Sequence, residues 1–176
     1  MDQAATTGVR PLVLVLCTGN AARSVMAGVM LEAEGAAVRV ITAGTHVVEN
    51  QPMSRRTRDA LTALGLDASG HRSRQLHDAD LDDADLVIAM AAEHVRFVRR
   101  RHPRASDRTA TLSWLARHLP GGPVPLAARV GRLDLTDVDP SIQGDVDDPA
   151  GGDEATYTAC ATQLTGLVAE LAARLA

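Results

Sequence analysis

The stretch from Pro11 to Gly28, PLVLVLCTGNAARSVMAG, constrains the fold of this chain more than any other. An apolar run, Leu12 to Leu16, is typical of a buried strand, and a helical pattern follows Ser24. A short polar loop that starts at Cys17 and closes with Arg23 lies between them. A strand that turns tightly into a helix N-terminus binds anions, because the loop N–H groups point inward and the helix dipole adds partial positive charge. The stretch therefore predicts an oxyanion site with a thiol at its base, in surroundings that favour a thiolate.

The composition excludes several other classes of function. All 18 basic residues are arginine, so the chain lacks the lysine that Schiff-base enzymes and Walker A loops require. The only aromatic residues are Phe97, Trp114 and Tyr157, too few for a base-stacking platform. The net charge is -4, which also argues against general nucleic-acid binding.

Length and apolar content indicate one domain. The 176 residues are 45% hydrophobic, enough for a single α/β core over residues 11–176, with residues 1–10 predicted to be a flexible tail. Two cysteines cannot build a disulfide framework, and no apolar run is long enough to cross a bilayer. We therefore expect a cytoplasmic protein without membrane contact. Cys160 lies on the apolar stripe of a helix and is predicted to be an inert core thiol.

Strands and helices alternate along the chain. Strand-helix-strand order predicts parallel pairing with right-handed crossovers, hence a three-layer α/β/α sandwich around a four-stranded parallel sheet. After Leu12–Leu16, the expected strands are 38–43, 86–90 and 109–112. The expected helices are 24–34, 54–64 with Ser54 as N-cap, 92–101, 113–118 and 154–175.

Three segments are harder to assign. The acidic segment 78–85 is interpreted as the start of a polar helix, because it lacks the glycine and final glutamate of a calcium loop. The arginines of 92–101 are interpreted as a solvated helix face, with a docking surface for an acidic partner as the alternative. Residues 120–152 are predicted to be an irregular stretch with a functional role.

Metal-free hydrolysis of a phosphate monoester needs an ionised nucleophile, a cationic clamp for the oxygens and an acid for the leaving group. Three groups fit these requirements: Cys17, Arg23 and an aspartate of the irregular stretch 120–152. The guanidinium of Arg23 suits bidentate contact with an oxyanion, and the Ser24 hydroxyl can donate to the thiolate. The simplest alternative is a small buried cysteine beside an exposed arginine.

Longer segments carry a resemblance to a known family. LCTGNAARSVMAG resembles the signature loop of the low-molecular-weight protein-tyrosine phosphatases, bacterial type. Four further segments resemble other parts of that family, in the same order: ITAGT at 41–45, GLDASGHRSRQL at 65–76, DLVIAM at 85–90 and VDDPAGGDEATY at 146–157. The resemblance implies a phosphotyrosine phosphatase I-like fold and a hydrolase without a cofactor.

The resemblance also implies roles for individual residues. Cys17 would be the nucleophile that forms a phosphocysteine, and Asp148 the general acid and then the base for water. Arg23 and the loop N–H groups would bind the phosphoryl group, and further side chains would shape the loop. The loop residues are Thr18, Gly19, Asn20, Ala21, Ala22, Arg23 and Ser24, and the supporting network is Asn20, Ser24, Thr42 and His71. Asp148 is preferred to Asp139 for its spacing to Tyr157, whereas Asp147 stays a competitor.

The sequence departs from the family pattern at several positions. Ala150 stands where many members have an aromatic residue that lines the phosphotyrosine pocket. This departure either argues against phosphotyrosine as the natural substrate or implies that Trp114 or another group lines the pocket here. Ala22 replaces a second loop cysteine, so a protective disulfide within the loop is excluded. Val25 stands where proline is common, and the chain is longer than compact members, mainly between Trp114 and Asp147.

The expected activity is hydrolysis of phosphotyrosine on a protein, or of a small aryl phosphate, with inhibition by phosphate-like oxyanions. The alternatives are a catalytically weak or silent oxyanion- or phosphoprotein-binding module and, less favoured for want of relay cysteines, an arsenate reductase. A monomer or weak homodimer is expected. No metal is predicted, because the histidines do not pair with cysteines at zinc spacing and are interpreted as scattered surface residues: His46, His71, His77, His94, His102 and His118.

Overall fold

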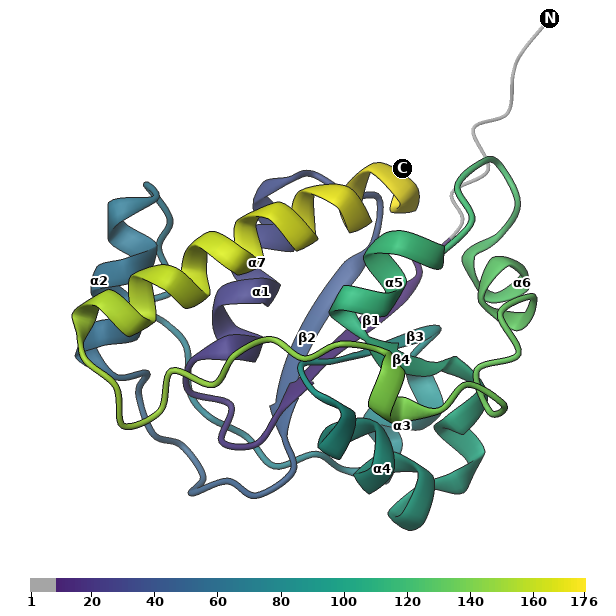
Figure 1. Cartoon of the computed structure of the whole chain (residues 1–176), viewed down its shortest axis with the longest axis horizontal. Helices are drawn as coiled ribbons and strands as arrows, with labels where there is room; N and C mark the ends of the chain where they lie inside the picture. The colour runs from purple at the N-terminus through teal and green to yellow at the C-terminus, as the bar shows by residue number, and fades with distance from the viewer. Residues whose placement is uncertain (1–8) are drawn as a thin grey trace, which may run out of the picture.

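The computed structural model describes residues 9–176 and contains four parallel strands with helices on both faces (Figure 1). The strands are β1 (Leu12–Cys17), β2 (Arg39–Gly44), β3 (Leu86–Ala89) and β4 (Thr109–Thr111), in the order β2-β1-β3-β4. Cys17 pairs in register with Gly44, and Leu16 with Ala89. The predicted three-layer α/β/α sandwich with a four-stranded parallel sheet is confirmed.

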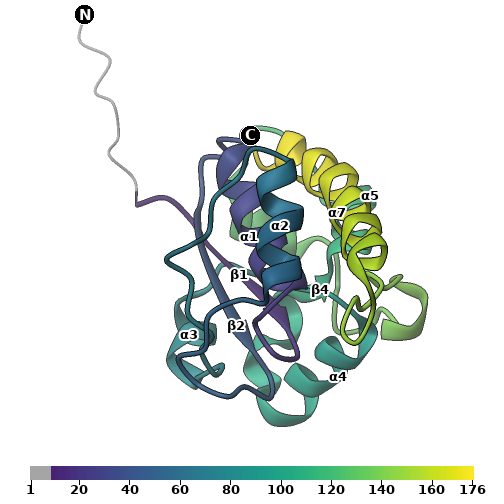
Figure 2. The same ribbon diagram turned by 90° about the vertical axis from the view of Figure 1, so that its left-hand side faces the viewer.

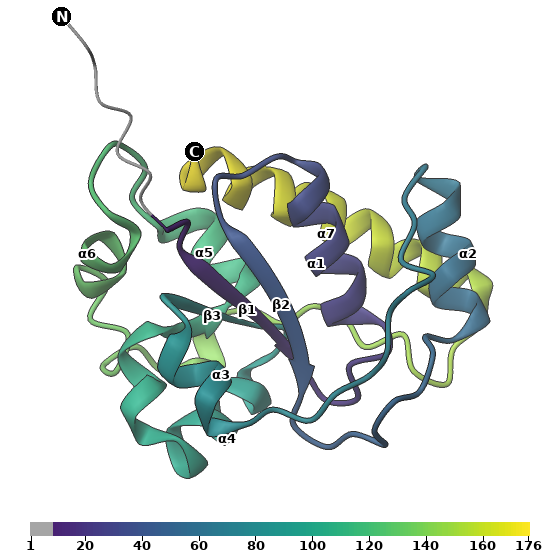
Figure 3. The same cartoon turned by 180° about the vertical axis from the view of Figure 1, so that it is seen from behind.

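The helices divide between the two faces of the sheet. On one face lie α1 (Arg23–Ala33), α2 (Arg55–Ala63), α5 (Leu112–His118) and α7 (Glu154–Leu175), of which α1, α2 and α7 run alongside one another in Figure 2. On the other face lie α3 (Asp78–Asp83), α4 (Ala92–Arg101) and the 3-10 helix η1 (Pro103–Arg108), and Figure 3 shows β2 at the edge of the sheet between these layers.

Alternation along β1 creates two cores, because successive side chains of a strand point to opposite faces. Val13, Val15 and Cys17 join the apolar cluster under α1 and α7, whereas Leu14 and Leu16 join the cluster under α3 and α4. The strand is buried over its whole length, as expected for a central parallel strand. Cys17 therefore ends a rigid element and starts the loop at the carboxyl edge of the sheet.

Most predicted elements occur within one or two residues of their expected bounds. Ser54 caps α2 by accepting a hydrogen bond from the Thr57 N–H at 3.1 Å, and α7 begins at Glu154 as predicted. The acidic segment forms α3, which supports the helical interpretation over a calcium loop. The predicted tail 1–10 lies largely outside the described residues, and the single domain of 11–176 stays a prediction.

Two expectations were wrong. Residues 120–152 are not wholly irregular, since they contain α6 (Leu126–Gly131) and the 3-10 helix η2 (Pro140–Ile142). The arginines of α4 are not all solvated, since Arg99 donates to the carbonyls of Leu135 and Val138, at 2.5 and 2.7 Å. Hydrogen bonds from α4 thus hold part of residues 120–152 in place.

Candidate active site

The loop between β1 and α1 brings Cys17 and Ser24 together. The Cys17 Sγ and Ser24 Oγ atoms are 3.0 Å apart, and both side chains are buried. Because β1 ends at Cys17 and α1 begins at Arg23, the intervening residues curl around the helix N-terminus. A hydroxyl in this position can donate a hydrogen bond to a thiolate.

Asn20 organises the loop from within. Its φ angle is 50°, a left-handed conformation that asparagine tolerates better than most residues. Its side-chain amide donates to Ser24 Oγ at 3.0 Å and to Thr42 Oγ1 at 2.9 Å. Its carbonyl accepts from His71 Nε2 at 2.8 Å, and its Oδ1 accepts from the Arg74 N–H at 3.0 Å. The structure thus brings together the predicted network and adds Arg74, which sequence reasoning missed.

Burial explains the charge state of His71. Desolvation lowers the pKa of this imidazole, while its hydrogen bond to the Asn20 carbonyl acts in the opposite direction. A carbonyl can only accept, so the His71 Nε2 atom carries the hydrogen. The ring therefore serves as a neutral donor that fixes the Asn20 peptide.

Neighbouring segments hold the loop from outside. The N–H groups of Thr45 and His46 donate to the carbonyls of Cys17 and Thr18, each at 3.0 Å. On the α2 side, Thr57 Oγ1 donates to the Ala21 carbonyl at 3.0 Å. Figure 3 shows the ends of β1 and β2 meeting at this edge of the sheet.

Gly44 permits the close approach of β2 to the loop. A Cβ atom at this position would lie 2.5 Å from the Thr18 carbonyl oxygen and 3.0 Å from the Asn20 nitrogen. Both atoms belong to the loop backbone, which is held from several sides. Any larger residue at position 44 would therefore push on the loop.

Arg23 and Asp148 form an ion pair across the pocket. Arg23 NH2 donates to Asp148 Oδ2 at 2.7 Å, and Arg23 NH1 donates to the Val146 carbonyl at 3.3 Å. The arginine side chain is only 5% exposed, whereas the aspartate side chain is 48% exposed. The other Asp148 oxygen accepts from the Ala150 N–H at 3.0 Å. A buried cation and an accessible carboxylate therefore meet beside Cys17.

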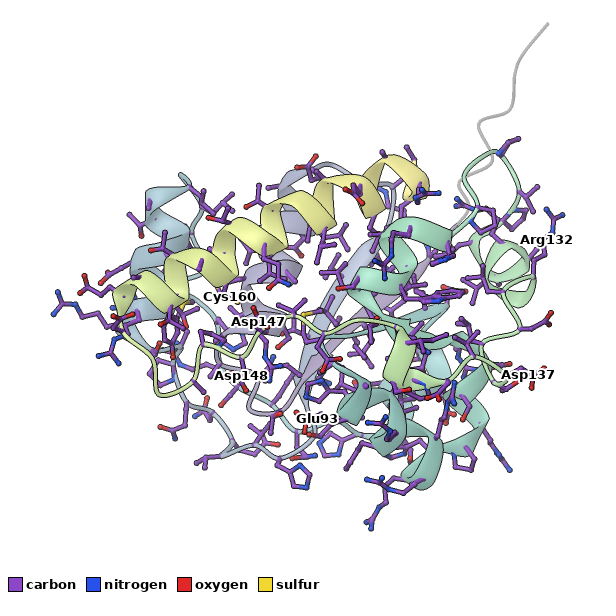
Figure 4. All side chains as sticks on the ribbon, in the orientation of Figure 1. Glu93, Arg132, Asp137, Asp147, Asp148 and Cys160 are labelled. Carbon is purple, nitrogen blue, oxygen red and sulfur yellow. The ribbon has the colours of Figure 1, made fainter. Side chains whose placement is uncertain are left out.

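The two aspartates that compete with Asp148 for the role of general acid, Asp139 and Asp147, lie outside the pocket that contains Cys17. Asp139 caps η2 by accepting from the Ser141 N–H at 2.8 Å, and this hydrogen bond lowers the pKa of its carboxyl. Asp147 is exposed, and its N–H donates to Gln163 Oε1 at 3.2 Å. In Figure 4, Asp148 lies on the loop that leads into α7, whereas Arg132 and Asp137 of the late segment lie towards the other end of the molecule. Only Asp148 of the three lines the pocket with Cys17.

The pocket has a volume of about 270 Å³. Its lining residues are Cys17, Thr18, Gly19, Ala21, Ala22, Arg23, Ser54, Asp148, Ala150 and Tyr157. Tyr157 is thus the aromatic residue of this lining. Of the two options, Trp114 or another group, the structure supports the second, because Trp114 is buried in the core and stacks on His118 with ring centroids 4.3 Å apart.

His94 was wrongly interpreted as a surface residue. It is 1% exposed, and its Nε2 atom lies 2.9 Å from Thr18 Oγ1. Burial, reinforced by the Arg23 charge, lowers the pKa of His94 to about 4, although Asp148 and Asp145 act in the opposite direction. A signal was present in the sequence, because His94 follows β3 at the edge of the sheet where parallel strands place ligand sites.

Residues 12–120 identify the family to which the chain belongs. These residues match the family model of the low molecular weight phosphotyrosine protein phosphatases. The chain belongs to that family. Membership confirms the resemblance carried by the loop and by residues 41–45, 65–76 and 85–90, and it makes the chain a protein phosphatase and a hydrolase.

Similar proteins extend the match beyond the family model. A protein-arginine-phosphatase of Geobacillus stearothermophilus is 31% identical over 164 residues, which cover 93% of this chain and 95% of that protein. A probable low molecular weight protein-tyrosine-phosphatase, EpsP of Ralstonia solanacearum, is 34% identical over 91 residues, covering 52% and 63%. The crystal structure of a low molecular weight protein tyrosine phosphatase from T. tengcongensis superposes with a TM-score of 0.74 at 30% identity, over 92% of this chain and 97% of that one.

Within residues 9–176, no group of three or more histidine, cysteine, aspartate or glutamate side chains is arranged to hold a metal ion. None of the helices in this range is long and apolar enough to cross a membrane.

Cys160 is 2% exposed, and burial raises the pKa of its thiol to about 11. This agrees with the expectation of an inert core thiol.

Proposed function

We propose that this phosphatase works in two steps through a phosphocysteine. The Cys17 thiolate attacks phosphorus, the bond from phosphorus to the substrate side chain breaks, and Asp148 gives its proton to the leaving atom. Water then attacks phosphorus, Asp148 takes up a proton from it, and the Cys17 sulfur leaves as a thiolate stabilised by Ser24. The observation that carries this proposal is that Cys17, Arg23 and Asp148 line one pocket, with Ser24 at 3.0 Å from the sulfur.

Arg23 and the loop N–H groups bind the phosphoryl group in this mechanism. Preorganised donors stabilise charge on the equatorial oxygens, because little reorganisation is needed during the reaction. The donors are the N–H groups of Thr18, Gly19, Asn20, Ala21, Ala22, Arg23 and Ser24. Asn20, Thr42 and His71 support them by holding the loop in shape.

We propose phosphoarginine in a protein as the preferred substrate, in place of the phosphotyrosine expected from the sequence. The similarity to an arginine phosphatase runs through almost the whole chain and includes the Asp148 segment. The pocket wall is built from small side chains at Ala21, Ala22 and Ala150. Asp148, which lines this pocket, would protonate the departing guanidine nitrogen.

Phosphotyrosine is the second candidate. The family model and relatives such as EpsP carry tyrosine in their names, and Tyr157 offers one ring to an aromatic substrate. Aromatic pairs add about 0.5–1.5 kcal/mol beyond area burial, so a second ring at position 150 would favour phosphotyrosine. The Ala150→Phe variant should therefore raise kcat/KM for phosphotyrosine about fivefold relative to phosphoarginine.

Two peptides of one sequence, carrying either phosphoarginine or phosphotyrosine at the same position, provide the test. Phosphate release is measured in the presence of EDTA, with Cys17→Ala beside the matched control Cys160→Ala. We expect at least a tenfold preference for phosphoarginine, no turnover by Cys17→Ala and full turnover by Cys160→Ala, because the nucleophile is indispensable. After acid quenching, mass spectrometry should find the phosphoryl group on the peptide that contains Cys17.

Other outcomes decide against parts of this proposal. A reversed preference would restore phosphotyrosine as the substrate. An inactive wild type that still binds vanadate would favour the silent binding module, and arsenate reduction with thioredoxin would favour the reductase. Activity that survives Cys17→Ala would overturn the mechanism. Inhibition by phosphate-like oxyanions, a monomer or weak homodimer and a cytoplasmic location stay predictions.

A further inference from the structure

A buried histidine without a place in the proposed mechanism touches the loop beside the nucleophile. His94 projects from the first turn of α4, and its ring is 1% exposed. Its Nε2 atom lies 2.9 Å from Thr18 Oγ1, across 76 residues of sequence. Thr18 directly follows Cys17, so this contact reaches the end of the loop that holds the sulfur.

The tautomer of His94 follows from its surroundings. Its Nδ1 atom is buried and has no hydrogen-bond partner among residues 9–176. A buried N–H without an acceptor is rare in proteins, so Nδ1 carries the lone pair and Nε2 the hydrogen. His94 then donates to Thr18 Oγ1, and the Thr18 hydroxyl donates onward to Glu93 Oε1 at 3.4 Å.

Burial, and not the sum of the neighbouring charges, disfavours a charge on the His94 ring. Arg23 of α1 repels an imidazolium, while Asp145 and Asp148 of the late loop and Glu93 of α4 attract one. The ring also lies in the first turn of α4, where the helix dipole opposes positive charge. Burial dominates this balance and sets the pKa of His94 at about 4, so the ring is neutral near pH 7.

We propose that His94 is a positioning residue: its neutral ring holds the Thr18 hydroxyl and so fixes the Cys17 end of the loop. This role rests on the proposed phosphatase mechanism, in which the Thr18 N–H and the Cys17 sulfur face the same phosphorus. The Thr18 carbonyl is held on the other side by the His46 N–H at 3.0 Å. Thr18 is therefore clamped between the segment after β2 and the start of α4.

Amide side chains of two lengths test this clamp. The Nε2 of glutamine reaches the position of the histidine Nε2, whereas asparagine is too short and leucine has no donor. A small displacement of reacting groups costs up to about a hundredfold, so we expect His94→Asn and His94→Leu to lower kcat/KM by about tenfold to a hundredfold. The same reasoning predicts that the vanadate inhibition constant of His94→Asn and His94→Leu is about tenfold higher than that of the wild type. For His94→Gln, both kcat/KM and the vanadate inhibition constant should stay within about threefold of the wild type. The matched control is His118→Gln, an exposed histidine bound to the Trp114 carbonyl, which should behave as wild type.

Nitrogen NMR of the wild type reports the tautomer of His94 directly, so a loss of stability in a variant does not affect this measurement. The His94 ring should show hydrogen on Nε2 and should stay neutral as the pH is lowered to about 5. Hydrogen on Nδ1, or a folded His94→Asn variant with wild-type kcat/KM and vanadate affinity, would overturn the proposal. If the wild type hydrolyses no phosphorylated peptide, the proposed function fails, whereas vanadate binding and NMR still decide the role of His94.

Discussion

The two walls of the pocket are held in different ways. The wall that carries Cys17 receives hydrogen bonds from the segments after β2, from α2 and from residues 71–74. The wall that carries Asp148 is anchored at Val146, whose N–H donates to the Met90 carbonyl at 2.8 Å. Beyond that point, the Asp148 carboxylate contacts Arg23 and the N–H of its own turn at Ala150.

The difference means that the Cys17 loop is held in a fixed geometry, whereas the Asp148 side chain is free to adjust its position. A nucleophile loop fixed from several sides can present its donors without reorganisation, which is the requirement for stabilising charge in a transition state. In the proposed mechanism, Asp148, whose side chain is 48% exposed, can follow a leaving group of variable shape. We therefore expect substitutions in the two walls to fail differently: through folding and geometry at the loop, and through the loss of proton transfer at Asp148.

The largest effect is expected at the acid. Asp148→Asn keeps the size of the side chain but removes the proton donor, so kcat should fall about a hundredfold or more. The neighbouring Asp147→Asn should stay within about twofold, because Asp147 does not line the pocket with Cys17. Steady-state kinetics and thermal unfolding check both variants, and the melting temperature should change little for either. Equal losses of kcat in the two variants would contradict the assignment.

The next effect is expected at the centre of the loop. Asn20→Ala removes the side-chain hydrogen bonds to Ser24, Thr42 and the Arg74 N–H, so kcat/KM should fall about a hundredfold through misplaced donors. Asn50→Ala is matched to it, because Asn50 also has a positive φ, 62°, but is exposed and outside the loop. The control should lose some stability and keep its activity. Loss of activity in both would show that backbone strain, and not the network, is decisive.

A smaller effect is expected where β2 passes the loop. Gly44→Ala forces the loop backbone to shift and should lower the free energy of unfolding by about 1–3 kcal/mol. Gly70→Ala, where a Cβ meets nothing within 4 Å, should be nearly neutral. Urea unfolding measures both, and kcat/KM of Gly44→Ala should fall with the distortion. Wild-type stability in Gly44→Ala would mean that the loop yields more easily than its hydrogen bonds indicate.

The last effect is confined to alkaline pH and leaves the protein unchanged near neutrality: a pH dependence of stability at Cys160. Burial raises the pKa of this thiol from 9.0 to about 11 in the folded protein, whereas the unfolded chain loses the proton near 9. Its contribution to stability is therefore complete below about pH 9 and is lost as the pH rises towards 11. Cys160→Ala should lack this loss, so the difference in unfolding free energy between the two proteins should narrow over that window. A difference independent of pH would contradict the buried, protonated thiol.

Local patterns predicted the elements that carry their own signals. The apolar β1, the Cys17 to Arg23 spacing and the long stripe of α7 are visible in single segments. The short helix α6 carried no comparable signal, because it has six residues and no side-chain cap. It is held instead by contacts such as that of Arg129 with the Pro120 carbonyl at 3.1 Å.

Burial of single polar or aromatic residues could not be predicted in the same way. His94 is buried by its contact with Thr18, which is 76 positions away in the sequence. Trp114 follows Thr111, the N-cap of α5, and its place in the core depends on the packing of α5 against α7. Such residues are placed by the fold as a whole, and no spacing within one segment reveals them.

Arg23 is shared between two anions, the Asp148 carboxylate and the phosphoryl group of the proposed mechanism. An oxyanion that takes the Arg23 NH2 donor competes with Asp148 for it, so the free energy of that ion pair is subtracted from the affinity. The subtraction applies equally to the substrate and to the inorganic phosphate that remains at the end. Because a remote part of a phosphoprotein can compensate the loss and free phosphate cannot, the shared arginine favours release of the product over its retention.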